Sequence, residues 1–297
     1  MYDRFAFGQD GHFFCKKEGE NLNQNWIVEN LNNAFSTWNG KLGELLGLVT
    51  TGPQTFKGGA VWGVMQTLHN GMVGIGYALV VLFFAISLCK NTMNFHELKR
   101  PEAAIHYLIR FVAAKALVGY GMDIMLNVFS ICNGIVTDMA DSMGGISEAM
   151  VSLPAEMQTA IENVGFLASI PLWLVTILGS LFITVLSFVM ILTVYGRFFR
   201  LYMYTALAPL PLAAFAGEST QSVGISFLKS YVGVCLEGAV IVLACVIYSA
   251  FVSTPTVASG EATTIVWSYL AETVFNMLVL VGLIKGSDRI IHEMMGL

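Results

Sequence analysis

Long stretches without a charged residue constrain this chain more than any other feature of its sequence. Three of them, Gly58–Cys89, Asn163–Gly196 and Gly238–Gly260, contain no Asp, Glu, Lys or Arg, and a fourth, Ala262–Ile284, is interrupted only by Glu272. A helix needs about 20 apolar residues to cross the hydrocarbon core of a bilayer. Each stretch is long enough, so the sequence predicts an all-α, multi-spanning integral membrane protein.

The composition agrees with this prediction. Hydrophobic residues make up 56% of the 297 residues and charged residues 12%, whereas soluble domains carry roughly 25% charged residues. A transmembrane domain is therefore expected over 58–297, as a bundle with five spans. In chain order the spans are expected at 71–89, within one long helix over 102–136 (embedded near 111–133), within 164–194, and at 231–252 and 265–284.

The first 57 residues are expected to form a separate polar segment. From Trp26 to Val49, apolar residues recur every three or four positions, with polar residues such as Glu29 and Asn33 between them. This spacing is typical of an amphipathic helix. Because a helix over 26–49 would be too polar to span a bilayer, it is expected at the membrane interface or against another subunit.

The distribution of basic residues sets the expected topology. Lys and Arg occur in 90–103, in 195–230 and in the C-terminal tail, and are absent from 137–163 and 253–262. Loops rich in Lys and Arg stay in the cytoplasm. The sequence therefore predicts a multi-pass protein of the cytoplasmic membrane with its N-terminus outside and its C-terminus inside.

One segment does not fit a simple series of spans. Residues 201–217 are uncharged, contain Pro209 and Pro211, and directly follow Arg197 and Arg200. Prolines disrupt a helix interior, and the basic residues put both ends of the segment on the same side of the membrane. The segment is therefore expected to turn back as a re-entrant hairpin; a short, kinked sixth span is the alternative.

No motif indicates an enzyme. The sequence contains no G-x-x-x-x-G-K-[ST] loop for phosphate binding, no HExxH and no paired CxxC. These motifs are what an ATPase, a metalloprotease and a structural zinc site require. Neither catalysis, nor a metal, nor a cofactor is therefore expected of this chain.

The candidate functional residues are instead ionisable side chains inside the expected spans. A charge is costly in lipid, so each must face protein or water. Either they line a polar passage or pair between subunits, or they form structural pairs within the chain, such as Lys115 with Asp123. The candidates are Lys115, Asp123, Glu237 and Glu272, with Arg197, Arg200, Pro209 and Pro211 marking the expected hairpin.

The region around this hairpin carries a family resemblance. Residues 197–216 read R-F-F-R-L-Y-M-Y-T-A-L-A-P-L-P-L-A-A-F-A, and G-E-S-T-Q-S-V-G-I-S-F-L-K-S-Y-V-G-V-C-L-E-G follows. This run resembles the TrbL-like polytopic membrane subunits of type IV secretion and conjugation systems. The ending S-D-R-I-I-H-E-M-M-G-L is similar to versions from conjugative elements of Gram-positive bacteria. The resemblance covers about 60–297.

The resemblance implies a non-enzymatic, oligomeric subunit of a translocation complex in the cytoplasmic membrane. Such a subunit helps DNA with its attached relaxase protein across the membrane. It works with other secretion-system membrane subunits, with membrane lipid and with separate ATPases that supply the energy. One departure is that no basic lining suited to DNA is visible, so contact with the DNA–relaxase substrate would be transient.

A secondary transporter or ion channel is the alternative function. The broken helix at 201–217 would then form its substrate site. Inverted repeats would favour a transporter, and the sequence shows none. A purely structural scaffold is a third possibility.

The predicted topology can be tested by cysteine labelling. Cysteines placed at Ser147 or Ser259 should react with an impermeant reagent from outside, and cysteines at Ser222 or Ser287 only from inside, because basic loops stay in the cytoplasm. Labelling of Ser222→Cys from outside would support the six-span alternative.

Overall fold

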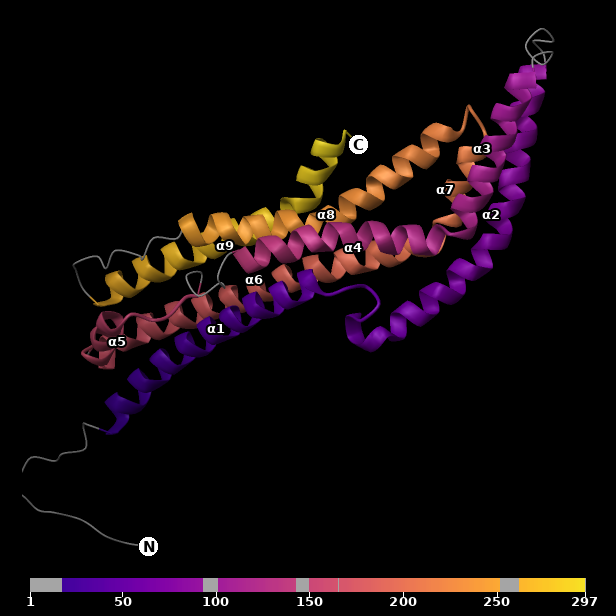
Figure 1. Ribbon diagram of the computed structural model, residues 1–297. Helices are drawn as coiled ribbons and strands as arrows, with labels where there is room; N and C mark the ends of the chain where they lie inside the picture. The colour runs from indigo at the N-terminus through magenta and orange to yellow at the C-terminus, as the bar shows by residue number, and fades with distance from the viewer. Residues whose placement is uncertain (1–17, 93–100, 143–149, 165, 252–261, 297) are drawn as a thin grey trace, which may run out of the picture. The chain divides into compact units, whose positions relative to one another are not determined.

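The computed structural model describes residues 18–92, 101–142, 150–164, 166–251 and 262–296 (Figure 1). Within these ranges every regular element is a helix, which confirms the all-α class. In chain order, with η for 3-10 helices, the elements are α1 (Glu18–Thr50), η1 (Phe56–Gly59), α2 (Ala60–Thr92), α3 (Pro101–Gly119), α4 (Gly121–Ser142), α5 (Ala155–Glu162), α6 (Phe166–Leu207), α7 (Pro209–Ala213), η3 (Ala214–Ala216), α8 (Gln221–Phe251) and α9 (Ala262–Met295).

Several helices have the length and composition of membrane spans. A fifth candidate span is a pair of helices, Ile105–Gly119 and Gly121–Asp141, bent by 73° at the break between them. The described part of the chain thus has four candidate spans, or five with the bent pair, which confirms a polytopic helical membrane protein. The four unbroken candidates are Phe56–Lys90, Ser169–Leu207, Gln221–Phe251 and Thr264–Met295.

The chain divides into two compact units. Among the described residues, the first contains 18–39, 151–164, 166–185 and 262–276, and the second contains the others. The division passes through α1, α6 and α9, so each of these helices contributes one part to each unit. The boundary predicted at residue 57, between a polar segment and a transmembrane domain, concerns where the membrane begins and stays a prediction.

Polar contacts to backbone hold the first unit together. Asn39 on α1 forms a reciprocal pair with Val151: its Nδ2 donates to the Val151 carbonyl at 2.8 Å, and its Oδ1 accepts from the Val151 N–H at 3.0 Å. On α9, the Tyr269 hydroxyl donates to the Ser152 carbonyl at 2.9 Å. The Tyr269 ring also meets the Phe35 ring edge to face. The segment before α5 is thereby fixed to α1 and α9.

The amphipathic pattern over 26–49 lies within α1. Its polar positions, such as Glu29 and Asn33, are exposed, and its apolar positions are almost completely buried. The helix therefore buries one face, as the spacing indicates; its place at a membrane interface stays a prediction. The buried positions, each at most 2% exposed, are Ile27, Leu31, Phe35, Trp38, Leu42, Leu45 and Val49.

The second unit gathers the C-terminal parts of α6 and α9 with α2, α3, α4 and α8. The Phe56 ring of η1 stacks on the Phe198 ring of α6, with centroids 4.0 Å apart. Helix α4 packs along α8, and the Tyr231 hydroxyl of α8 donates to the Met125 carbonyl at 2.8 Å. The short elements α7 and η3 contact α2, α3 and α8.

The prediction of a single long helix over 102–136 is wrong. The structure divides it into α3 and α4 at Tyr120, with a bend of 73°. Gly119 and Gly121 flank the bend, and a side chain on Gly121 would lie 3.1 Å from Leu212 of α7. A larger residue at 121 would therefore press on the Leu212 side chain. Backbone hydrogen bonds continue on both sides of Tyr120, so the bend leaves few groups unpaired.

The expected third span is also longer than predicted. The sequence places it within 164–194, whereas α6 has 42 residues and ends at Leu207. At 1.5 Å per residue this is about 63 Å, roughly twice the thickness of a hydrocarbon core. Arg197 and Arg200 therefore lie inside the helix and not at its end. Both side chains have oxygen partners there.

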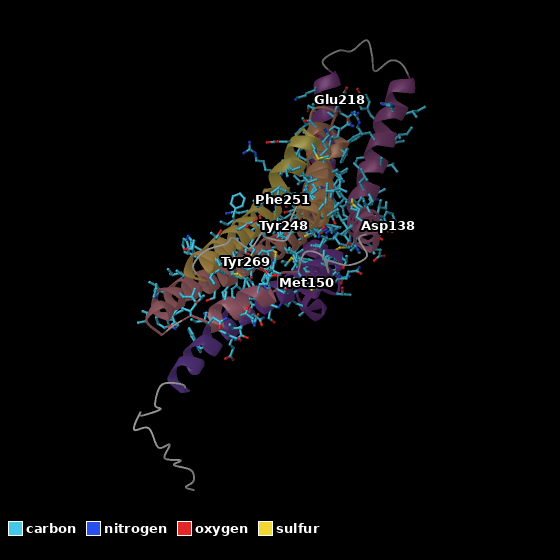
Figure 2. All side chains as sticks on the ribbon, turned by 90° about the vertical axis from the view of Figure 1, so that its left-hand side faces the viewer. Asp138, Met150, Glu218, Tyr248, Phe251 and Tyr269 are labelled. Carbon is cyan, nitrogen blue, oxygen red and sulfur yellow. The ribbon has the colours of Figure 1, made fainter. Side chains whose placement is uncertain are left out.

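The proline-containing segment 201–217 is divided: its first seven residues complete α6, and two very short helices follow. The eight residues 209–216 make up α7 and η3. They extend about 12 to 16 Å, short of the roughly 30 Å of a hydrocarbon core. A turn then leads into α8; Figure 2 shows Glu218 beyond one end of α8 and Phe251 at the other. That the segment turns back within the membrane stays a prediction.

Close packing of α2 on α7 gives a test of this arrangement. A Cβ at Gly76 would lie 2.9 Å from the Pro209 carbonyl oxygen and 2.9 Å from Val118 Cγ1, whereas a Cβ at Gly74 would meet nothing within 4 Å. Gly76→Ala should destabilise the protein by about 1–3 kcal/mol through overpacking. Gly74→Ala, the matched control, should be neutral or stabilise by up to about 1 kcal/mol through helix propensity. Equal melting temperatures of both variants in detergent would contradict the packing.

Candidate functional site

Arg197 lies at the centre of the second unit and is completely buried. Its guanidinium donates three hydrogen bonds to backbone carbonyls: Nε to Val234 at 3.2 Å, Nη1 to Val49 at 3.2 Å and Nη2 to Cys235 at 3.0 Å. Val49 is in the last turn of α1, where carbonyls have no partner within their own helix. Arg197 of α6 thus caps α1 and also binds α8.

Gly238 and Phe129 lie next to this guanidinium, the first leaving space for it and the second contacting it. A Cβ at Gly238 of α8 would lie 2.7 Å from Arg197 Nη1, so no larger residue fits without displacing the arginine. The Phe129 ring of α4 lies 5.9 Å from Arg197 Cζ, within reach of a cation–π interaction. Four helices, α1, α4, α6 and α8, therefore meet at one side chain.

A second charged group lies one turn further along α6. Arg200 Nη2 donates to both carboxylate oxygens of Glu237, each at 2.7 Å, and Nη1 forms an ion pair with Asp288. Glu237 is 1% exposed and also accepts a hydrogen bond from the Ser287 hydroxyl at 3.2 Å. Two arginines and two carboxylates thus form a charged cluster that joins α6, α8 and α9.

The structure brings three of the predicted site residues together, namely Arg197, Arg200 and Glu237. Lys115 on α3 and Asp123 on α4 are both exposed, and neither belongs to an ion pair among the described residues. The pair of Lys115 with Asp123 that the sequence allows is therefore absent from the described part of the chain.

The remaining predicted residues lie elsewhere. Glu272 is exposed on α9, in the part of that helix that belongs to the first unit. Pro209 is the first residue of α7, and Pro211 lies in the same helix.

Asp288 and Ser287 are members of the charged cluster that the sequence prediction misses. Lys285 marks the end of the predicted last span at Ile284, but α9 continues to Met295. The buried Ile291, two turns beyond Ile284, is the signal that would have extended the helix.

The burial of Ser287 also changes the labelling experiment on topology, because a buried cysteine would not react with the reagent. A cysteine at the exposed Arg289 replaces Ser287→Cys as the internal labelling site.

A polar cavity of about 570 Å³ lies between the turn after α1 and one face of α4. It includes Asp123, one of the predicted lining residues. The Asn133 Oδ1 atom in its wall is buried and has no hydrogen-bond partner, while Nδ2 donates to the Thr50 carbonyl at 3.1 Å. The lining residues are Gly52, Pro53, Gln54, Asp123, Leu126, Asn127, Phe129, Ser130 and Asn133.

Comparison with protein families identifies what kind of membrane protein this is. Residues 38–209 match the family described as TrbL/VirB6 plasmid conjugal transfer like protein. The chain belongs to this family. The matched residues include Arg197, Arg200 and Pro209, and they begin and end earlier than the 60–297 expected from the sequence. Comparison with curated proteins and with solved structures gave no significant match.

Membership of the TrbL/VirB6 family establishes the broad role of the chain. Proteins of this family are membrane subunits of conjugal transfer systems and are generally non-enzymatic. The candidate spans agree with a multi-pass membrane protein. Within this protein, Arg200 connects α6 to α8 through Glu237 and to α9 through Asp288.

The Arg200–Glu237 pair can be tested by comparison with an exposed pair. Glu237→Gln should lower the free energy of unfolding by about 3 kcal/mol, the lower end of the range for a broken buried pair, because Arg200 keeps Asp288. Glu293→Gln, which breaks the exposed pair with Arg289, should cost less than about 1 kcal/mol. Equal loss in denaturant or thermal unfolding would show that the cluster does not stabilise the bundle.

Proposed function

We propose that this protein is a channel subunit of a conjugal transfer system of the Gram-positive type. The observation that carries the proposal is the family match over 38–209. In the proposed arrangement, copies of the chain assemble as a homo-oligomer in the cytoplasmic membrane, with N-termini outside and C-termini in the cytoplasm. Other membrane subunits join them, separate ATPases supply the energy, and DNA with its relaxase is the substrate.

The exposed face of α4 supports a role in lining the passage. Five polar residues of this face are exposed, namely Asp123, Asn127, Ser130, Asp138 and Asp141. They follow one another at three or four residues, except that the exposed Gly134 takes the position between Ser130 and Asp138. A polar face on a helix at membrane depth must meet water or protein. We assign this face to the passage, with the cavity around Asp123 as its widened part.

Lys115 and Glu272 support contacts between copies. Both are exposed charges on helices that are otherwise apolar enough to span a membrane. Exposure to lipid would be costly, so a second copy or water must receive them. In the proposed oligomer they pair across subunits, whereas Glu237 has its partner within the chain.

The charge of α4 bears on what the passage contacts. Residues 121–142 contain no Lys or Arg, and an acidic lining repels a phosphate backbone. We therefore assign the close contacts to the relaxase polypeptide, while the DNA passes with only transient contact.

Mating experiments test this function. Deleting the gene in a donor strain should abolish transfer, and plasmid-borne protein should restore it; normal transfer without the protein would refute the proposal. Asn127→Trp should block transfer by filling the passage, while Leu192→Trp, on the exposed apolar face of α6, should not. Both variants must reach the membrane in equal amounts, as measured by immunoblot. If the two variants transfer equally well, α4 does not line the passage.

A further inference from the structure

The prolines of α7 leave two backbone carbonyls without their helical donors, because Pro209 and Pro211 have no N–H. These are the carbonyls of Leu207, which is exposed, and of Thr205, which is buried. In an α-helix the carbonyl of residue 205 accepts from the N–H of residue 209, but residue 209 is proline and has no N–H. The helical pattern resumes directly afterwards, where the Leu212 N–H donates to the Ala208 carbonyl at 3.1 Å. Thr205 is 3% exposed. Its carbonyl is therefore shielded from water and would lose the free energy of a hydrogen bond if no other donor reached it.

A histidine on another helix supplies the donor. His69 Nδ1 lies 2.7 Å from the Thr205 carbonyl oxygen, although the two residues are 136 positions apart in the chain. A carbonyl only accepts, so the Nδ1 atom carries the hydrogen and donates it. His69 is itself 2% exposed. The interaction thus connects the N-terminal half of α2 to the place where α6 ends.

The same imidazole lies beside the second backbone break. A Cβ on Gly121, the first residue of α4 after the 73° bend, would lie 3.5 Å from His69 Cε1 and 3.8 Å from Nε2. It would also lie 3.1 Å from Leu212 of α7. Two turns further along α2, Gly76 lets the Pro209 carbonyl approach closely. Both breaks therefore meet one face of α2, and His69 is the polar residue between them.

We propose that His69 is a positioning residue: by donating to the Thr205 carbonyl it fixes where α6 ends and how α7 and η3 lie on α2, next to the α3–α4 bend. Its consequence for DNA transfer rests on the proposed function. The positioning itself does not, because it concerns the hydrogen bond that Pro209 removes.

A disulfide between α2 and the end of η3 can report this position. A Cβ at Gly217 would lie 3.5 Å from the Phe83 Cβ, which is within the range of a disulfide. It would also lie 2.6 Å from Thr220 Oγ1, so every variant in this experiment also carries Thr220→Ala. In a variant with all native cysteines replaced by Ala, Phe83→Cys and Gly217→Cys should form a disulfide rapidly with copper-phenanthroline and oxygen. His69→Leu should slow this several-fold, and His69→Asn, which keeps a short N–H donor, should restore much of the rate. His106→Leu, at an exposed histidine of α3, is the matched control and should have no effect.

A double-mutant cycle with Pro209 identifies the hydrogen bond itself. Pro209→Ala returns an N–H to residue 209, so His69→Leu should lower the melting temperature much less in a Pro209→Ala background. Additive losses of melting temperature from His69→Leu and Pro209→Ala would overturn the proposal. Equal rates of disulfide formation with His69 and with His69→Leu would also overturn it, as would equal reductions of this rate by His69→Leu and His69→Asn. Normal mating in a deletion strain, with the His69 effects intact, would refute the proposed function and leave the positioning role standing.

Discussion

The rest of the second unit depends on the burial of Arg197. A guanidinium away from water needs an oxygen for its N–H groups, and here backbone carbonyls of two other helices provide them. Removing such a charge from water costs several kcal/mol unless the hydrogen bonds are well formed. This requirement fixes α1 and α8 around α6 and explains why Gly238 has no side chain. Arg200, one turn later, repeats the arrangement with carboxylates and adds α9.

The two backbone breaks, at Tyr120 and Pro209, face the same requirement if they lie within the membrane, as the candidate spans predict. Irregular backbone is tolerated there only where protein or water satisfies its polar groups. At Tyr120 the helical hydrogen bonds continue through the bend, so little has to be replaced. At Pro209 a donor is missing, and a histidine from α2 provides it. The two breaks thus differ in cause, one being flanked by glycines and the other imposed by proline. Helix α2 lies beside both, and α7, which begins at the proline break, packs against α3 next to the other.

The sequence was sufficient for the class of protein but not for the partners of its charges. Charge-free stretches predict spans by length alone, and the period of 26–49 predicts which face of α1 is buried. Counting Lys and Arg treats a charge as a loop marker, so it cannot detect that Arg200 meets Glu237 and lies inside a longer helix. Glu237 could be chosen as a candidate because a carboxylate in a span must be paired. Its partners on α6 and α9 depend on tertiary packing, which a single sequence does not reveal.

The two kinds of polar group in this protein suit different tasks. In the buried cluster, Arg197 has three carbonyl partners, and Glu237 accepts from Arg200 and Ser287. A group whose hydrogen bonds are already made gains nothing from a passing substrate, and moving it would expose an unpaired charge. The polar face of α4 is exposed along its length and is rich in acceptors. We therefore infer that the buried charges hold the bundle together, while the polar face of α4 contacts the substrate that passes through. Substitutions that lower the stability of the bundle and substitutions that block transfer are then expected at different residues.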